Sequence, residues 1–303
     1  MKRKRRSDML TIDPKETPVP KLHQYLLGSV APRPIAFAST LNETGVSNLA
    51  PFSFFNVFSA NPPIAIFSPA RRGRDNTTKH TFENVKQIAE CVINVVNYDL
   101  LHQMNLASTE YPDGVSEFVK AGLTPLASEK VKPFRVAESP IQMECVVKQV
   151  IELGADGGAG NLIVCEVVLM HINENILDDE GRISPMKLDQ VARMGGHYYT
   201  RANKGLFELP QPVKIGMGVD MLPADIRNSK ILTGNNLGQL GMIESLPDET
   251  MVNEYKLTEL ADLFIQHEKN KTVLEQKLHE QAKALLDTGN VQDAWKTLLA
   301  FND

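Results

Sequence analysis

A cluster of basic residues stands before and at the start of a predicted helix in the first third of the chain. The helix is predicted over residues 78–88, because Phe82, Val85 and Ile88 recur at helical spacing. Its N-terminus favours an anion, since the first N–H groups lack helical partners and the helix dipole is positive there. The cluster therefore predicts a phosphate site, with a solvated run of charges as the alternative. The candidate side chains are Arg71, Arg72, Arg74, Lys79 and Thr81.

Composition places the chain among ordinary globular proteins. Its 303 residues are 42% hydrophobic and 23% charged, with a formal net charge of −5, which disfavours a nucleic-acid partner. The basic run at residues 2–6 is the exception, and it is either an arm for an anionic partner or a solvated terminus. No secretory signal follows it, and no stretch approaches the ~20 apolar residues of a membrane span. We expect a soluble, cytoplasmic protein with neither a membrane nor a nucleic-acid partner.

The cysteines do not form a metal or disulfide motif. Cys91, Cys145 and Cys165 are odd in number, show no CxxC spacing, and each stands in an apolar or β-branched run. This pattern predicts buried, inert thiols, with no disulfide and no bound metal.

Short apolar runs dominate the chain from about residue 30 to 200. Strands are predicted over 34–40, 63–70, 91–97, 141–153 and 161–172, and a glycine-rich connection suited to a hairpin joins the last two. Polar residues recur within these runs, which favours an antiparallel sheet or barrel over a buried parallel sheet. With few helices between the strands, we expect a closed β-structure with helices packed outside it.

The composition changes after about residue 210. Residues 211–248 are rich in Gly, Pro and Asn and predict an extended arm, and helical periodicity follows from 257 onward. Leu274, Leu278, Ala282 and Leu285 fall on one face of a predicted helix. We therefore expect an N-terminal arm (1–20), one domain (21–210), and an arm with a helical extension (211–303).

Several sequence words in the first domain occur in a specific order. They are GSVAPRPIAFAST, GVSNLAPFSFFNVFS, PPIAIFSPARR, TTKHTFENV, YPDGVSEFVKAGLTPL, VAESPIQMEC and VARMGGHYYTR. The ordered set resembles the flavin reductase-like, FMN-binding split-barrel family over about residues 20–205. The resemblance implies a mainly β fold with helices (α+β), namely an FMN-binding split β-barrel, to which this chain adds a C-terminal helical extension.

The resemblance also implies an activity. FMN would accept hydride from NADH or NADPH, which is then a substrate, and the reduced flavin could supply a separate oxygenase component. A homodimer is expected, because family members commonly complete the pocket from a second chain. The chain has no GxGxxG opening a βαβ unit, so nicotinamide would bind on the flavin face. Two alternatives stay open: a flavoprotein whose tightly bound FMN does its own oxygen or electron-transfer chemistry, and a flavin-binding protein without turnover.

The resemblance assigns flavin contacts near the first strands. Ser39 and Thr40 end the first predicted strand, and residues 48–53 would lie along the ring edge, although a polar β-turn is the alternative for that segment. The family commonly has an acid where His80 stands, which puts an orienting role there in doubt. The contacts predicted for ring and phosphate are Ser39, Thr40, Asn48, Leu49, Ala50, Pro51, Ser53, Ser68, Arg71, Arg74, Lys79 and Thr81.

Later residues would complete the pocket. His171 ends a predicted strand and, by resemblance, would be catalytic near the nicotinamide; a histidine bonded to the backbone is the alternative. Arg193, Gly196 and Tyr198 would close the flavin or nicotinamide pocket. Four phenylalanines are expected in the barrel core, with at most one touching the ring: Phe52, Phe54, Phe55 and Phe58.

Overall fold

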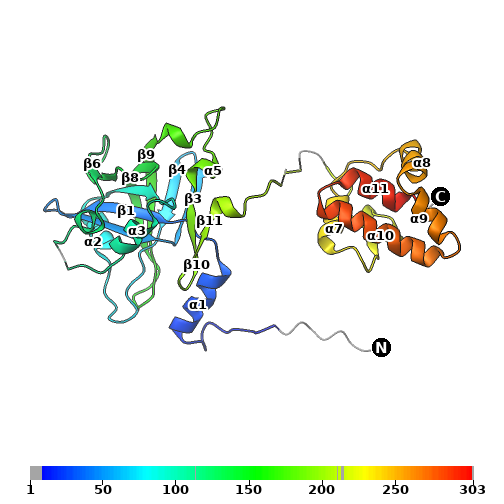
Figure 1. Cartoon of the computed structure of the whole chain (residues 1–303). Helices are drawn as coiled ribbons and strands as arrows, with labels where there is room; N and C mark the ends of the chain where they lie inside the picture. The colour runs from blue at the N-terminus through cyan, green and yellow to red at the C-terminus, as the bar shows by residue number, and fades with distance from the viewer. Residues whose placement is uncertain (1–8, 113, 210, 213–214, 302–303) are drawn as a thin grey trace. The chain divides into compact units, whose positions relative to one another are not determined.

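The computed structural model describes residues 9–112, 114–209, 211–212 and 215–301, so the basic run at 2–6 lies outside the described residues. The chain divides into two compact units, residues 1–207 and 208–303 (Figure 1). Each unit is described by itself.

The first unit is built on one antiparallel sheet of seven strands in the order β2-β1-β5-β8-β9-β4-β3. The five strands expected from the sequence correspond to β1, β4, β5, β8 and β9, and residues 153–160 join the last predicted pair. Two short pairs, β6–β7 and β10–β11, stand apart from this sheet. The bounds are β1 Ala36–Leu41, β2 Ser47–Phe52, β3 Phe55–Ala60, β4 Pro63–Phe67, β5 Glu90–Val95, β6 Pro125–Leu126, β7 Arg135–Val136, β8 Ile141–Glu152, β9 Asn161–Ile172, β10 Val191–Gly195 and β11 Tyr198–Arg201.

The sheet is curled because its two edge strands are neighbours in the chain. β2 and β3 stand at opposite ends of the strand order, yet only Ser53 and Phe54 connect them. The Cα atoms of Phe52 and Phe55 can therefore be at most about 11 Å apart. The sheet must bend until one end of β2 meets the start of β3, which gives a barrel that is split between these two strands.

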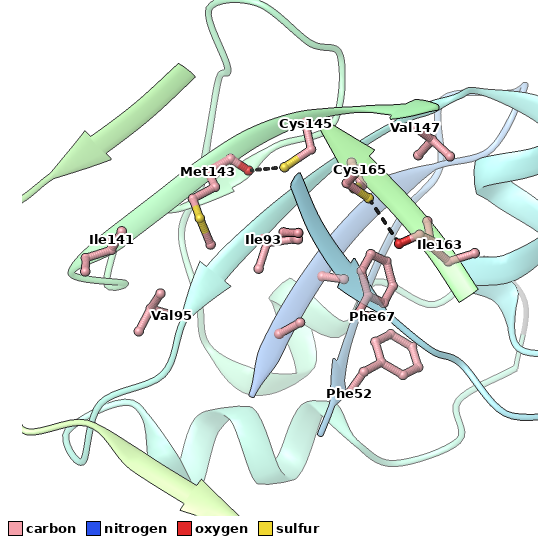
Figure 2. Packing of buried hydrophobic residues seen from close by; sticks show 14 of the residues in the cluster. Phe52, Phe67, Ile93, Val95, Ile141, Met143, Cys145, Val147, Ile163 and Cys165 are labelled. Carbon is pink, nitrogen blue, oxygen red and sulfur yellow. Dashed lines mark hydrogen bonds between the residues drawn. The ribbon is translucent and has the colours of Figure 1, made fainter. Parts of the chain in front are cut away.

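The interior of the barrel is filled by alternate side chains of its strands (Figure 2). Phe67, Ile93 and Ile163 are fully buried there. All three cysteines are free and buried, as predicted, and the Sγ atoms of Cys91 and Cys165 lie 3.6 Å apart. The bond to Cys91 and burial raise the pKa of Cys145 well above its usual value, so the thiol stays protonated and unreactive.

Helices cover the outside of this barrel. Side chains of α3 and α4 pack with Phe37 and Leu49, which places a second apolar cluster on the outer face of β1 and β2. Phe82 and Val85 of α2 join the interior cluster instead. The helices and 3-10 turns of this unit are α1 Val19–Ser29, α2 His80–Gln87, α3 Leu101–Ala107, α4 Glu117–Ala121, η1 Glu174–Ile176, α5 Pro185–Leu188 and η2 Ala202–Lys204.

The expected placement of the phenylalanines is only partly right. Phe52 is buried and Phe55 packs against the interior cluster. Phe54 and Phe58 are exposed, so placing them in the core was wrong. Phe58 lies on the edge strand β3 and Phe54 lies in the connection before it, where side chains that point away from the interior are not covered by another layer of the described residues of this unit.

The second unit is helical and has its own core around the single tryptophan of the chain. Trp295 is fully buried, and its Nε1 donates to the carbonyl of Leu240 at 3.1 Å. Residues 211–248 were expected to form an extended arm, but they contain η3, α6 and α7. None of the described helices of either unit is long and apolar enough to cross a bilayer. The bounds are η3 Val219–Met221, α6 Ala224–Arg227, α7 Gly234–Leu240, α8 Glu249–Thr258, α9 Ala261–His267, α10 Lys271–Asp287 and α11 Val291–Leu299.

Candidate functional site

Two adjoining hollows lie along the edge strand β2. Their volumes are about 190 and 270 Å³, and both are lined by Pro51 and Ser108, so they form one groove. We call it the β2 groove. Side chains lining its first part include Ala50, Arg72, Lys79, Thr81 and Glu110. Side chains lining its second part include Ile35, Ser53, Met104, Arg193 and Tyr199.

Three cationic side chains gather at one end of the β2 groove. Arg72 Nε and Lys79 Nζ lie 3.0 and 2.9 Å from the same oxygen, Glu110 Oε1. Arg74 Nη2 bonds the other carboxylate oxygen, Oε2. The bonds from Lys79 and Arg72 lower the pKa of Glu110 to about 2, so its carboxylate is ionised at any physiological pH. Three cations are thus directed at one anion.

The N-terminus of α2 faces the same end of the groove. Its N-cap residue, Lys79, makes no side-chain cap, and Lys79, His80 and Thr81 all line the hollow. Asn48 Nδ2 donates to Thr81 Oγ1 at 2.8 Å, which fixes the helix start against β2. An uncapped helix start beside three cations is a site for a phosphate-sized anion.

The middle of the groove follows the outer edge of β2, an edge strand of the sheet. β2 pairs with β1 on one side only, so alternate backbone groups on its other side have no partner strand. At Leu49 the outward N–H donates to Glu117 Oε2 at 3.0 Å, and at Pro51 there is no N–H to satisfy. Burial raises the pKa of Glu117, although the Leu49 N–H opposes this shift. Residues 48–52, for which a polar β-turn was the alternative, therefore form a strand.

The far end of the groove is formed by the β10–β11 hairpin. Arg193 Nη1 donates to the hydroxyl of Tyr199 at 2.8 Å, and its Nη2 donates to the carbonyl of Gly196 at 2.8 Å. The guanidinium lies 4.7 Å from the centre of the Tyr199 ring. Arg193 and Arg33 exchange both backbone hydrogen bonds, which holds the hairpin to the unit. Tyr198, on the same hairpin, is 78% exposed and does not line the groove.

Several predicted contacts do not reach the β2 groove with their side chains. Ser39, Thr40 and Leu49 are fully buried, and Thr40 Oγ1 accepts from Asn84 Nδ2 at 3.1 Å. Ser68 is buried and its hydroxyl has no partner among the described residues. Arg71 binds Asn76 through Nε at 2.7 Å and Nη2 at 2.8 Å, so its guanidinium is used within its own loop. Arg72, the next residue, supplies the charge to the groove instead.

His171 lies elsewhere on the sheet. Its Nε2 is 2.8 Å from Oε1 of the fully buried Glu144. Glu144 also accepts from the backbone N–H groups of Glu129 and Lys130, at 2.9 and 2.6 Å. His171 does not line either part of the β2 groove. Its hydrogen-bond partner is a buried carboxylate, which differs from the backbone bond given as the alternative.

The sequence did not point to two lining residues, Glu110 and Tyr199. Glu110 stands 38 positions after Arg72, in the segment between α3 and α4, and no periodicity relates the two. Tyr199 follows the predicted Tyr198, and neighbouring residues of a strand point to opposite faces. Across the described part of the chain, no cluster of three or more His, Cys, Asp or Glu could hold a metal ion.

The residues present fit an elongated ligand with a phosphate at one end and a flat ring at the other. Arg72, Arg74 and Lys79 already hold an internal carboxylate where the phosphate would bind. Half-buried Pro51 lines both parts of the groove, and Ser53 and Arg193 line the part away from the phosphate end. FMN has this distribution of charge and shape.

Comparison with known proteins also relates this chain to flavin proteins. Residues 27–194, more than half of the chain, match the model of the flavin reductase like domain. A protein of Aquifex aeolicus whose function is not characterised is 37% identical over 188 residues, which is 62% of this chain and 93% of that protein. In Bacillus cereus nitrilotriacetate monooxygenase component B, 34% of residues are identical, at a TM-score of 0.62, over 66% of this chain and 98% of that chain. Pseudomonas fluorescens 2-nitrobenzoate 2-nitroreductase is 25% identical, with a TM-score of 0.60, over 71% of this chain and 99% of that chain.

Proposed function

The chain belongs to the flavin reductase-like family, and from this premise we propose that it binds FMN in the β2 groove and reduces it with NADH or NADPH. The observation that carries the proposal is the carboxylate of Glu110, an anion of the chain itself. Glu110 is held by three cations beside an uncapped helix start, at one end of a groove long enough to continue along an edge strand. A flavin phosphate would use the same donors.

The residues of the groove have separate tasks in this proposal. Arg72 and Lys79 neutralise the phosphate, and the N–H groups at the start of α2 donate to its oxygens. The edge of β2 around Ala50 and Ser53 meets the polar rim of the ring system. Arg193 and Tyr199 bound the ring at the other end. When bound, FMN supplies the hydride acceptor, and the chain supplies position and charge.

The donor would bind on the open face of the ring. Hydride transfer from a nicotinamide needs no protein nucleophile and no metal, only two rings held face to face. The β2 groove is open to solvent, with Ser108 and Asn105 of the α3 end on its wall. Transient binding of NADH or NADPH at this wall requires no dinucleotide-binding domain.

A second copy of the chain would cover the exposed side of the barrel. β3 is an edge strand whose Val57 and Phe58 are 60% and 64% exposed, and Phe54 beside it is exposed as well. Apolar side chains on an unpaired edge favour association with another chain. We therefore propose a homodimer through this face.

The product would then serve a partner enzyme. The similarity to a monooxygenase component B supports release of reduced flavin to a separate oxygenase component. The similarity to a nitroreductase favours the second possibility, in which the flavin stays bound and reduces an organic substrate directly.

Anaerobic titration of the purified protein with FMN and then with NADH or NADPH tests the proposal. We expect saturable flavin binding, bleaching of the flavin absorbance by one equivalent of donor, and recovery in air. Faster NADH consumption with excess FMN indicates a reductase that releases flavin, and no acceleration indicates a retained cofactor. Failure to bind FMN would contradict the proposal, and bound flavin that neither donor bleaches would leave a flavin-binding protein without turnover.

A further inference from the structure

The carboxylate of Glu110 accepts one hydrogen bond from each member of the cation cluster, defined here as Arg72, Arg74 and Lys79. Its Oε1 accepts from Arg72 Nε at 3.0 Å and from Lys79 Nζ at 2.9 Å, and its Oε2 accepts from Arg74. Three separate donors converge on one group. A phosphate that binds these side chains would meet this carboxylate, because both anions approach the same three cations.

The charges favour one of these two anions at a time. Asp75 also contacts Arg74, at 3.1 Å, so the cation cluster with Asp75 and Glu110 carries one net positive charge. A phosphate monoester brings a charge of about −1.5 to −2 near neutral pH. Adding it while Glu110 stays would leave an excess of negative charge. Exchanging Glu110 for the phosphate leaves the cluster close to neutral.

Glu110 is free to leave without unfolding its surroundings. Its side chain is 35% exposed, and it belongs to the segment between α3 and α4. The neighbouring backbone bonds of this segment are local, from Thr109 to Leu106 and from Tyr111 to Thr109. A rotation of the side chain toward solvent therefore breaks only its contacts with the cation cluster.

We propose, on the basis of the function proposed above, that Glu110 is an internal competitor of the flavin phosphate, and that this competition weakens the binding of FMN. Each binding event replaces the Glu110 carboxylate on Arg72 and Lys79 by the phosphate. Part of the phosphate's interaction energy is offset by the ion pairs lost. The competition lowers the affinity for FMN but not for riboflavin, which has no phosphate.

The test compares dissociation constants for FMN and riboflavin, measured by quenching of flavin fluorescence, in the full-length protein and in Glu110→Gln. We expect the FMN constant to fall about five- to tenfold, since exposed ion pairs contribute modestly and several are lost together. The riboflavin constant should stay unchanged. Glu110→Ser repeats the measurement without the amide oxygen, which could still hold the cations.

Glu83→Gln is the matched control. Glu83 is an exposed carboxylate in the first turn of α2, and it accepts from Thr78 Oγ1 at 2.5 Å without contacting the cation cluster. This variant makes the same change in charge nearby, and we expect less than about a twofold effect on FMN, because exposed charges are screened by salt.

Three results would overturn the inference: FMN affinity equal or weaker in both Glu110 variants, an equal gain for riboflavin, or an equal gain in Glu83→Gln. Failure of the proposed function looks different, because the unmodified protein would then bind neither flavin.

Discussion

Nε2 of His171 lies 2.8 Å from Oε1 of Glu144. His171 is on β9 and Glu144 is on the neighbouring strand β8, and the Glu144 carboxylate also bonds the segment at residues 129–131. The Glu144 carboxylate is fully buried and receives backbone N–H groups of that segment. A buried carboxylate needs such partners, so the pair has a structural reason to exist that is independent of catalysis.

Replacing His171 should therefore affect stability more than hydride transfer. In His171→Ala, Glu144 loses one bond but keeps its backbone donors, and we expect a loss of about 1–2 kcal/mol in the free energy of unfolding. Urea denaturation measures this loss, and stopped-flow bleaching of bound flavin by NADH should give an unchanged rate. A slower reduction at full flavin content would instead place His171 at the nicotinamide.

The same carboxylate predicts a pH dependence of stability. Burial alone would raise the pKa of Glu144, but the N–H groups of Glu129 and Lys130, together with His171, bring it below its ordinary value of 4.5. The unfolded state then binds the proton more readily, so the stabilisation is present above about pH 4.5 and is lost as the pH falls through the folded-state pKa. In urea titrations, Glu144→Gln should be less stable than the unmodified protein at pH 7, and the difference should shrink in acid. A difference independent of pH would contradict this account.

The phosphate assignment predicts that Arg72, together with Lys79, matters for FMN binding and that the adjacent Arg71 does not. Arg72→Ala with Lys79→Ala removes two charge-assisted bonds to the phosphate, and we expect FMN to bind about 10- to 100-fold more weakly. Arg71→Ala is the matched control, because its guanidinium binds Asn76. Fluorescence titration with FMN and with riboflavin separates loss of the phosphate site from general damage. Equal weakening for both flavins would mean that the substitutions disturb the barrel.

Glu117 offers a test of the edge strand. Its Oε2 accepts the outward N–H of Leu49, and burial raises its pKa. Glu117→Ala leaves a buried donor without its acceptor and should cost about 1–3 kcal/mol in unfolding free energy. Glu117→Gln keeps an acceptor of the same shape and removes the burial cost of the charge, so it should be close to neutral at pH 7. A large loss for Gln as well would show that the charge itself is required.

A charged substitution on the edge strand β3 tests the proposed dimer. Phe58→Lys places a charge on the exposed apolar edge of β3, and we expect the mass in solution, measured by light scattering, to halve. Leu257→Lys is the control, since Leu257 is 77% exposed but belongs to α8 of the helical unit. Dissociation by the control variant alone would move the interface to the helical unit.

The single tryptophan reports on the helical unit. Trp295 is fully buried among helices of the second unit, which has its own apolar core. Leu278→Ala in that unit should lower the denaturation midpoint followed by tryptophan fluorescence, through a loss of about 2–5 kcal/mol. The midpoint followed by bound flavin should not change. A parallel shift of both signals would mean that the two units unfold together.

The sequence alone was sufficient to predict those features of the structure that depend on short-range patterns of residues. The apolar runs predicted five of the seven barrel strands, the cysteine contexts predicted buried thiols, and the basic residues were placed before the α2 start because they are its neighbours in the chain. The order of the sequence words indicated the family. The strands, the thiols and the basic residues before α2 depend on residues within a few positions of one another, so local propensity and spacing are enough to predict them.

Only the tertiary structure decided which of the neighbouring side chains form the site. Arg71 and Arg72 are equivalent in sequence, but one binds Asn76 and the other reaches Glu110, 38 positions away. The segment at 48–52 became an edge strand because β2 and β3 end up at opposite edges of a curled sheet. Such outcomes depend on contacts between distant parts of the chain. The energies of these contacts exceed local conformational preferences, and the spacing of residues in the sequence does not reveal them.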